Sequence, residues 1–65
     1  MTASALYPTL TISIEIEMVR KGYFLVHEVQ VGRASFLTEW SSLEDAEARA
    51  EFLRDLWRQR GATVV

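Results

Sequence analysis

His27 is the only histidine of the chain and lies within the apolar stretch YFLVHEVQV. Nucleophilic catalysis would pair its imidazole with a thiol or a hydroxyl group, but the chain has no cysteine. Ser13 and Ser35 are expected on the opposite face of a β-sheet from His27, which argues against a triad. We therefore interpret His27 as a hydrogen-bonded side chain at the edge of the core, opposite Ile16, and predict no catalytic residue.

Four glutamates are the other side chains whose chemistry deserves consideration. Metal binding through oxygen ligands alone usually comes with a ligand-bearing loop, and acid pairs that cleave glycosidic bonds need a cleft, which a small flat sheet does not offer. We predict no metal and no cofactor, and expect either a solvated sheet face or a negative surface that binds a basic partner protein. The four residues are Glu15, Glu17, Glu28 and Glu39.

Three arginines near the C-terminus, Arg54, Arg58 and Arg60, form the last group of chemical interest. Cations stabilise the C-terminal end of a helix because they offset its macrodipole, and this role accounts for their position. The alternative is a phosphate-contacting patch aided by Arg33, although no nucleotide-binding motif surrounds these residues.

The length of the chain limits the fold to a single domain over residues 1–65. A lone core in a chain below about 70–80 residues rarely stabilises it by more than about 3–5 kcal/mol, so such chains often need a further constraint. Without cysteines the chain forms no disulfide and no thiolate zinc site. Oligomerisation is the constraint that remains, so we expect a homo-oligomer.

Charge and hydropathy restrict the partners and the location of the chain. Nine acidic and seven basic residues give a net charge of −2, which disfavours nucleic-acid binding because that requires a basic surface. No apolar run reaches the roughly 18–20 residues that span a bilayer, and the start, MTASALYPTL, lacks the pattern of a secretory signal. We expect no membrane contact and a cytoplasmic location.

A strict period of two organises the first half of the chain. From Thr9 to Val19, apolar residues occupy every second position, which is the pattern of a β-strand with one buried face. Residues 1–8 precede this strand as an N-terminal arm. The apolar positions are Leu10, Ile12, Ile14, Ile16 and Met18.

Two more strands complete a β-meander over residues 9–40. A two-residue turn at Lys21-Gly22 precedes a strand from Tyr23 to Val31, and a type II′ turn at Gly32-Arg33 precedes a strand from Ala34 to Trp40.

These turns set the register of both hairpins, pairing Ile14 with Val29 and Val29 with Phe36. A three-residue first turn would instead set Ile14 against Glu28, which is worse unless a β-bulge intervenes. The preferred register gives one apolar face, formed by Ile12, Ile14, Ile16, Met18, Leu25, Val29, Val31, Phe36 and Trp40.

The opposite sheet face gathers four apolar residues near the Lys21-Gly22 turn. Single apolar residues are common on protein surfaces, but a group of them rimmed by glutamates suggests a contact patch for another protein. The four residues are Val19, Phe24, Val26 and Leu37.

A helix over residues 42–60 is predicted to cover the apolar face. Ser41 or Ser42 fits a capping box at its start, and Gly61 suits the position after its end. Residues 62–65 form either a short fourth strand at the sheet edge or a tail.

The helix is apolar over more than half of its circumference. At about 100° per residue, one apolar stripe is enough to cover the sheet. This stripe consists of Leu43, Ala46, Ala50, Leu53 and Trp57. A second line, Ala48, Phe52 and Leu56, would remain in water in a monomer. We predict that this line and the bordering Arg49 self-associate in a two-fold dimer. The alternative is that Phe52 folds over the sheet edge and covers the N-terminal arm around Leu6 and Tyr7.

The order of three antiparallel strands and a helix resembles the small arm-type DNA-binding domain at the front of tyrosine recombinases. The segments GYFLV and SFLTEWSSLEDAE correspond to strands and to the helix start of that family. The resemblance implies a sheet that enters the major groove with basic side chains, but glutamates occupy the matching face here. In size and acidity the chain is also similar to small phage or mobile-element proteins that disarm host machinery as compact dimers.

We predict an α+β fold: a three-stranded antiparallel meander in the order 1-2-3, with one C-terminal helix on one face. The expected function is a small non-enzymatic protein–protein interaction module, a homodimer that binds or inhibits another protein. The alternative is a small β-sheet nucleic-acid-binding domain of the recombinase arm-binding type. The acidic sheet face favours the first function over the second.

Overall fold

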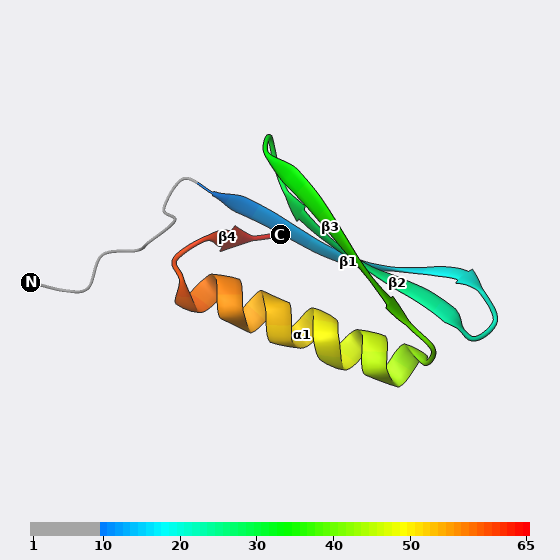
Figure 1. The fold of residues 1–65 in the computed structure, drawn as a ribbon. Coiled ribbons are helices and arrows are strands. Elements are labelled where there is room, and N and C mark those ends of the chain that lie inside the picture. The colour runs from blue at the N-terminus through cyan, green and yellow to red at the C-terminus, as the bar shows by residue number, and fades with distance from the viewer. Residues whose placement is uncertain (1–9) are drawn as a thin grey trace, which may run out of the picture.

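The structure, a computed structural model, describes residues 10–65; the predicted N-terminal arm and Thr9 lie outside the described residues. The elements are β1 (Thr11–Arg20), β2 (Tyr23–Gln30), β3 (Ala34–Trp40), α1 (Leu43–Gln59) and β4 (Thr63–Val64). One sheet has the order β3-β2-β1-β4, with β1, β2 and β3 antiparallel and β4 parallel to β1. Figure 1 shows α1 lying across one face of this sheet. The predicted α+β fold is confirmed.

The C-terminal segment forms a strand rather than a tail. Thr63 N donates to Leu10 O, and Val65 N donates to Ile12 O, each at 2.9 Å. Gly61 adopts a φ of 88°, a left-handed conformation that glycine takes readily after a helix end. The chain thereby returns to the edge of β1 and covers its first residues.

Ser42 caps the start of α1. Its Oγ accepts a hydrogen bond from Asp45 N at 3.1 Å, which satisfies one of the free N–H groups of the first helical turn. Glu44 and Asp45 lie in that turn and Arg58 in the last one, where their charges offset the helix dipole. The helix begins and ends one residue inside the predicted range.

The predicted register of the first hairpin is wrong by one residue. The Lys21-Gly22 turn pairs Arg20 with Tyr23 as expected, but a β-bulge after Met18 shifts the pairing, so that Met18 lies opposite Phe24. The bulge places one extra residue in β1. Because side chains alternate between the two faces, this shift turns β2 over relative to β1.

The second hairpin contains a compensating shift. Its loop has three residues, Val31 to Arg33, instead of the predicted two, and Gln30 therefore lies opposite Ala34 and Glu28 opposite Phe36. Two shifts of one residue cancel at β3. Phe36 accordingly remains on the face toward α1, as predicted, and β2 alone is reversed.

The reversal of β2 changes which of its side chains enter the core. Val26 is buried, with 1 % of its surface exposed, and Phe24 packs against the buried cluster. Leu25, His27 and Val29 lie on the other face. The buried residues are Leu10, Ile12, Ile14, Val26, Ala46, Ala50, Leu53, Trp57 and Ala62.

Four residues predicted to contribute to the core are instead largely in solvent: Met18 is 67 % exposed, Val31 56 %, Phe36 52 % and Leu43 48 %. Val31 is exposed because it lies in the three-residue loop between β2 and β3. Figure 1 shows the cause for Met18: the β1–β2 hairpin extends past the first turn of α1, so that the helix does not cover its end.

Candidate protein-interaction surface

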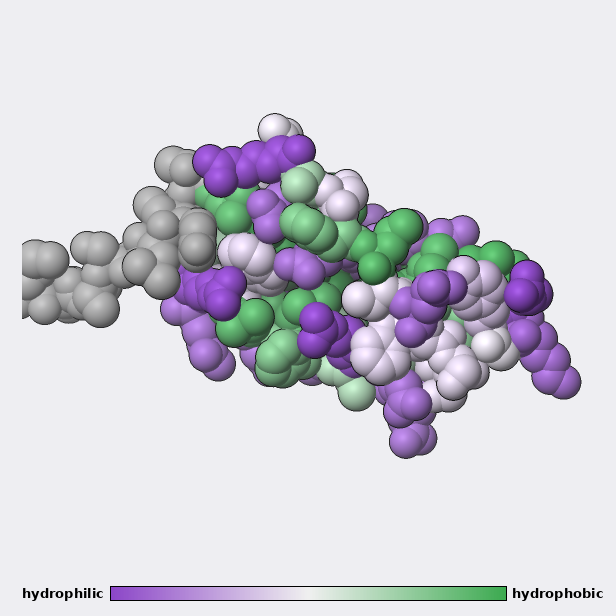
Figure 2. Space-filling view, in the orientation of Figure 1, coloured by the Kyte–Doolittle hydropathy of each residue, from purple (hydrophilic) through white to green (hydrophobic). Residues whose placement is uncertain are grey.

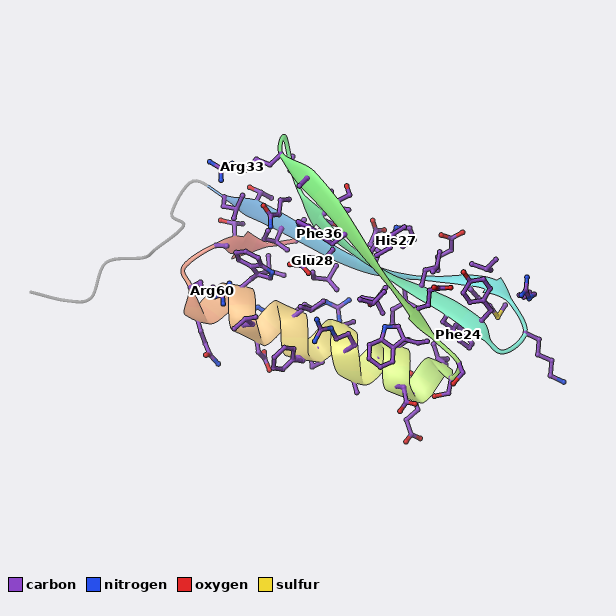
Figure 3. All side chains as sticks on the ribbon, in the orientation of Figure 1. Phe24, His27, Glu28, Arg33, Phe36 and Arg60 are labelled. Carbon is purple, nitrogen blue, oxygen red and sulfur yellow. The ribbon has the colours of Figure 1, made fainter. Side chains whose placement is uncertain are left out.

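The face of the sheet turned away from α1, named the outer face, combines acidic and aliphatic side chains from three strands. Figure 3 shows His27 on this side of the sheet, away from the helix. The alternation of paired residues assigns to this face Glu15 and Glu17 from β1, Leu25, His27 and Val29 from β2, and Leu37 and Glu39 from β3.

The structure brings together only part of the predicted partner-binding set. Glu15, Glu17, Leu37 and Glu39 lie on the outer face. Val19, in the bulge, is 42 % exposed. Val26 and Phe24 were expected on this face and instead face α1, because β2 is reversed. Leu25, His27 and Val29 take their places, and no alternation in the sequence of β2 distinguishes the two arrangements.

Glu28 was also expected on the outer face, and that prediction is wrong. Its Oε2 accepts a hydrogen bond from Trp57 Nε1 at 2.7 Å, and Figure 3 shows Glu28 between the sheet and α1. The guanidinium carbon of Arg60 lies 5.2 Å from the centroid of the Trp57 ring. Glu28 therefore connects β2 to the helix and does not contribute to an exposed acidic surface.

His27 lies on the outer face and not, as predicted, toward the helix opposite Ile16. Its Nε2 hydrogen-bonds with Glu17 Oε1 at 2.7 Å, and Glu15 is its direct cross-strand neighbour. In the described part of the chain, Ser13 Oγ donates to Glu15 Oε2 at 3.4 Å and not to the imidazole. This arrangement orients the imidazole, and among residues 10–65 no hydroxyl group forms a hydrogen bond with it.

An open hollow of about 350 Å³ lies where β3 ends, lined by Gly22, Tyr23, Glu39, Trp40 and Ser41. Tyr23 Oη donates to Glu39 Oε2 at 2.7 Å. This hydrogen bond is the main reason that the pKa of Tyr23 lies above its ordinary value of 10.0, because the carboxylate stabilises the protonated phenol. The hollow is open to solvent and encloses no buried site.

β3 forms an exposed edge of the sheet. Val31 N donates to Thr11 O at 3.0 Å, so the odd-numbered residues of β2 bond to β1 and the even-numbered ones bond to β3. In β3 the even-numbered residues therefore bond to β2. The odd-numbered ones, Ser35, Leu37 and Glu39, direct their N–H and C=O groups away from the sheet.

Apolar side chains of β3 are exposed on both of its faces. Phe36, toward α1, is 52 % exposed, and Leu37, on the outer face, is 56 % exposed. Figure 2 shows mostly apolar, green surface over the first half of β3. The strand ASFLTEW contains no proline and no lysine, two residues that commonly protect an exposed edge.

The opposite edge of the sheet is better covered. β4 pairs with Thr11 and Ile12 of β1, and Arg54 Nη2 donates to Ile14 O at 3.1 Å. The rest of β1 carries a bulge after Met18, and bulges discourage further strand pairing. The two edges are thus not equivalent, and β3 offers the longer regular stretch.

The helix residues predicted to self-associate lie at the surface. Phe52 is 55 % exposed, Ala48 is exposed and Leu56 is half-buried. The guanidinium carbon of Arg49 lies 5.3 Å from the Phe52 ring centroid, and Arg49 Nε is buried without a hydrogen-bond partner among the described residues.

The direction in which this helix surface faces follows from Arg54. At about 100° per residue, Arg49 and Leu56 lie on the flank of α1 opposite Arg54. Because Arg54 bonds to the β1 edge, the flank with Arg49 and Leu56 faces the β3 side. Figure 2 shows green surface along α1 and over β3 on the same side of the molecule.

The C-terminal arginines do not converge on one point. Arg54 also pairs with Glu51 at 3.4 Å and Arg58 with Asp55 at 3.3 Å, while Arg60 lies over Trp57. Figure 3 shows Arg33, in the β2–β3 loop, well apart from Arg60. This distribution gives no shared phosphate site.

Within residues 10–65, no group of three or more His, Cys, Asp or Glu residues is arranged to hold a metal ion. No helix in that range is long and apolar enough to cross a membrane. In comparisons with protein-family models, curated proteins and solved structures, no match to this chain is found.

Proposed function

We propose that the chain is a non-enzymatic protein-interaction module that acts as a homodimer and binds, or inhibits, another protein. One observation carries this proposal: within residues 10–65, eight large apolar side chains are exposed beside a buried core of nine residues, three of which are alanines. So small a core stabilises a monomer weakly. Contacts that bury the exposed side chains would therefore supply both stability and binding energy.

The outer face is the surface that we assign to the other protein. Its aliphatic centre consists of Leu25, Val29 and Leu37, and its acidic groups come from Glu15, Glu17 and Glu39. A basic protein would bury the aliphatic side chains and meet complementary charge at their border, which favours both specificity and the rate of association.

The second copy of the chain is assigned to the opposite side, where α1 and β3 lie. Phe52, with Ala48, Arg49 and Leu56 around it, supplies an apolar helix surface whose burial would contribute roughly 1.5–3 kcal/mol for a fully buried large side chain. Two-fold pairing is the commonest arrangement for such self-association.

Affinity capture from the native host tests the assignment of the outer face. We expect a protein that is bound by the wild-type chain, retained by Leu43→Glu and lost by Leu25→Glu. Both variants introduce the same charge in place of leucine, but Leu43 lies at the start of α1, outside the outer face. Thermal unfolding of both variants establishes that they are folded. Equal capture by the two variants would contradict the assignment.

A further inference from the structure

We infer that the second copy pairs with β3, edge to edge and antiparallel, so that the sheets of both copies form one continuous sheet. The inference rests on the homodimer of the proposed function. It adds the strand that forms the interface, the relative orientation of the two copies and the register between them.

The backbone of β3 supplies the first reason. Ser35, Leu37 and Glu39 direct their N–H and C=O groups outward with no further strand beside them in the described part of the chain. An antiparallel copy of β3 presents the same groups in reverse order and pairs with all of them. The β1 edge is a poorer candidate, because β4 and Arg54 occupy its regular part.

The charges at the two ends of β3 select the register. If Phe36 lies opposite Phe36 of the second copy, Arg33 lies opposite Glu39 of the second copy, and this charge pair occurs twice by symmetry. Ser35 then lies opposite Leu37. Centring the pairing on Leu37 instead would set Glu39 opposite Ser35 and leave Arg33 without an acidic partner.

Glu39 has the capacity for this second interaction. Its Oε2 accepts the hydrogen bond from Tyr23, and a carboxylate has about four acceptor sites on its two oxygens. Arg33 forms no ion pair with another described residue of its own copy, and its side chain is exposed.

The same two-fold axis brings the β3-facing flanks of the two α1 helices toward each other. Antiparallel edge pairing keeps both helices on one side of the joined sheet, and the flank of each α1 with Arg49 and Leu56 faces the axis. Phe36 of each copy lies at the centre, on the face of β3 that is turned toward α1. Of the helix residues predicted to self-associate, Arg49 and Leu56 therefore face the space above the paired strands and do not form the primary contact. Ala48 lies about 200° around the helix from the buried Ala46 and Ala50, on the side turned away from the sheet.

Single-cysteine variants test this register directly, because the chain has no cysteine of its own. In this register, Phe36 and Phe36 of the second copy would form a non-hydrogen-bonded antiparallel pair. Their Cα atoms would be about 4.5 Å apart, a distance that a disulfide can bridge. The two Leu37 Cα atoms would be roughly 8–9 Å apart, beyond disulfide reach. Leu37→Cys is a matched control, since Phe36 and Leu37 are similarly exposed.

The experiment oxidises Phe36→Cys, Leu37→Cys and Phe52→Cys under mild conditions and measures covalent dimer by intact mass. We expect Phe36→Cys to cross-link at least several-fold faster than the other two. Faster cross-linking of Leu37→Cys would overturn the register. Cross-linking of Phe52→Cys alone would overturn pairing through β3 and leave the homodimer in place, whereas a wild-type monomer at tens of micromolar in sedimentation would overturn both.

A charge exchange gives a second test that needs no cross-link. Arg33→Glu and Glu39→Arg each place like charges opposite one another at both ends of the interface, so each should shift the wild-type dimer toward monomer. The double variant Arg33→Glu/Glu39→Arg restores opposite charges and should restore the dimer. If the double variant dissociates as much as the single ones, the charge pairing is wrong.

Discussion

At the scale of single residues, the contact between Tyr23 and Glu39 has the clearest electrostatic consequence. The hydrogen bond from Tyr23 Oη to Glu39 Oε2 is the largest cause of the raised pKa of Tyr23, followed by desolvation. Arg20, whose guanidinium carbon lies 4.9 Å from the ring centroid, acts in the opposite direction because it favours the phenolate. The effect of Glu39 on the pKa of Tyr23 is therefore larger than the opposite effect of Arg20.

We expect the Tyr23 phenol to ionise above pH 10.0, and Glu39→Gln to lower this pKa toward the ordinary value. Absorbance titration of the phenolate in a Tyr7→Phe background, where Tyr23 is the only tyrosine, measures the effect. Since the folded chain holds this proton more tightly than the unfolded chain, the contact stabilises the fold below the ordinary pKa. That contribution is lost as the pH rises through the raised pKa. A pKa that Glu39→Gln leaves unchanged would exclude the contact in solution.

At the scale of the elements, the sequence determines β1 and α1 more clearly than it determines β2. β1 alternates strictly between apolar and polar residues, and Ser42 and Gly61 mark the ends of the helix. β2 has apolar side chains on both faces, Phe24 and Val26 on one and Leu25 and Val29 on the other, so alternation cannot select the buried face. The bulge after Met18 and the three-residue loop make that selection.

The residues of the outer face could be predicted from the sequence on β1 and β3 but not on β2. Glu15, Glu17, Leu37 and Glu39 lie on strands whose orientation is as predicted, whereas Val26 and Glu28 lie on the reversed β2. The exposure of β3 depends on how far one helix extends across a twisted sheet. This is a property of packing between distant segments, and no local pattern in the sequence encodes it.

The faces of β2 can be tested by two neighbouring substitutions. Val26→Ala removes atoms from the core and should lower the free energy of unfolding, as Ile14→Ala should by about 2–5 kcal/mol. Leu25→Ala, on the outer face, should cost less than Val26→Ala although leucine is the larger residue. Urea denaturation measures all three. A larger loss for Leu25→Ala would mean that Leu25, and not Val26, faces the core.

At the scale of the whole molecule, one helix on a four-stranded sheet leaves two different surfaces uncovered. The outer face is acidic and aliphatic, and the β3 edge has backbone groups that no other strand within residues 10–65 pairs with, together with exposed apolar side chains. Pairing through β3 would place the outer faces of both copies side by side on one surface. A partner with two binding sites would then gain avidity from the dimer, because its second contact becomes intramolecular.

The negative charge of the two outer faces leads to a prediction about nucleic-acid binding. Proteins that bind duplex DNA neutralise several phosphates and show a steep dependence on salt, whereas Glu15, Glu17 and Glu39 would repel them. We expect no specific binding to duplex DNA at ~150 mM salt in electrophoretic shift and titration experiments. The matched variant Glu15→Lys/Glu17→Lys/Glu39→Lys reverses the charge of the same face and should gain salt-dependent binding. Sub-micromolar binding by the wild-type chain, lost in Arg33→Glu or Arg58→Glu, would contradict this expectation, because the arginines would then form a phosphate-binding surface that outweighs the acidic face.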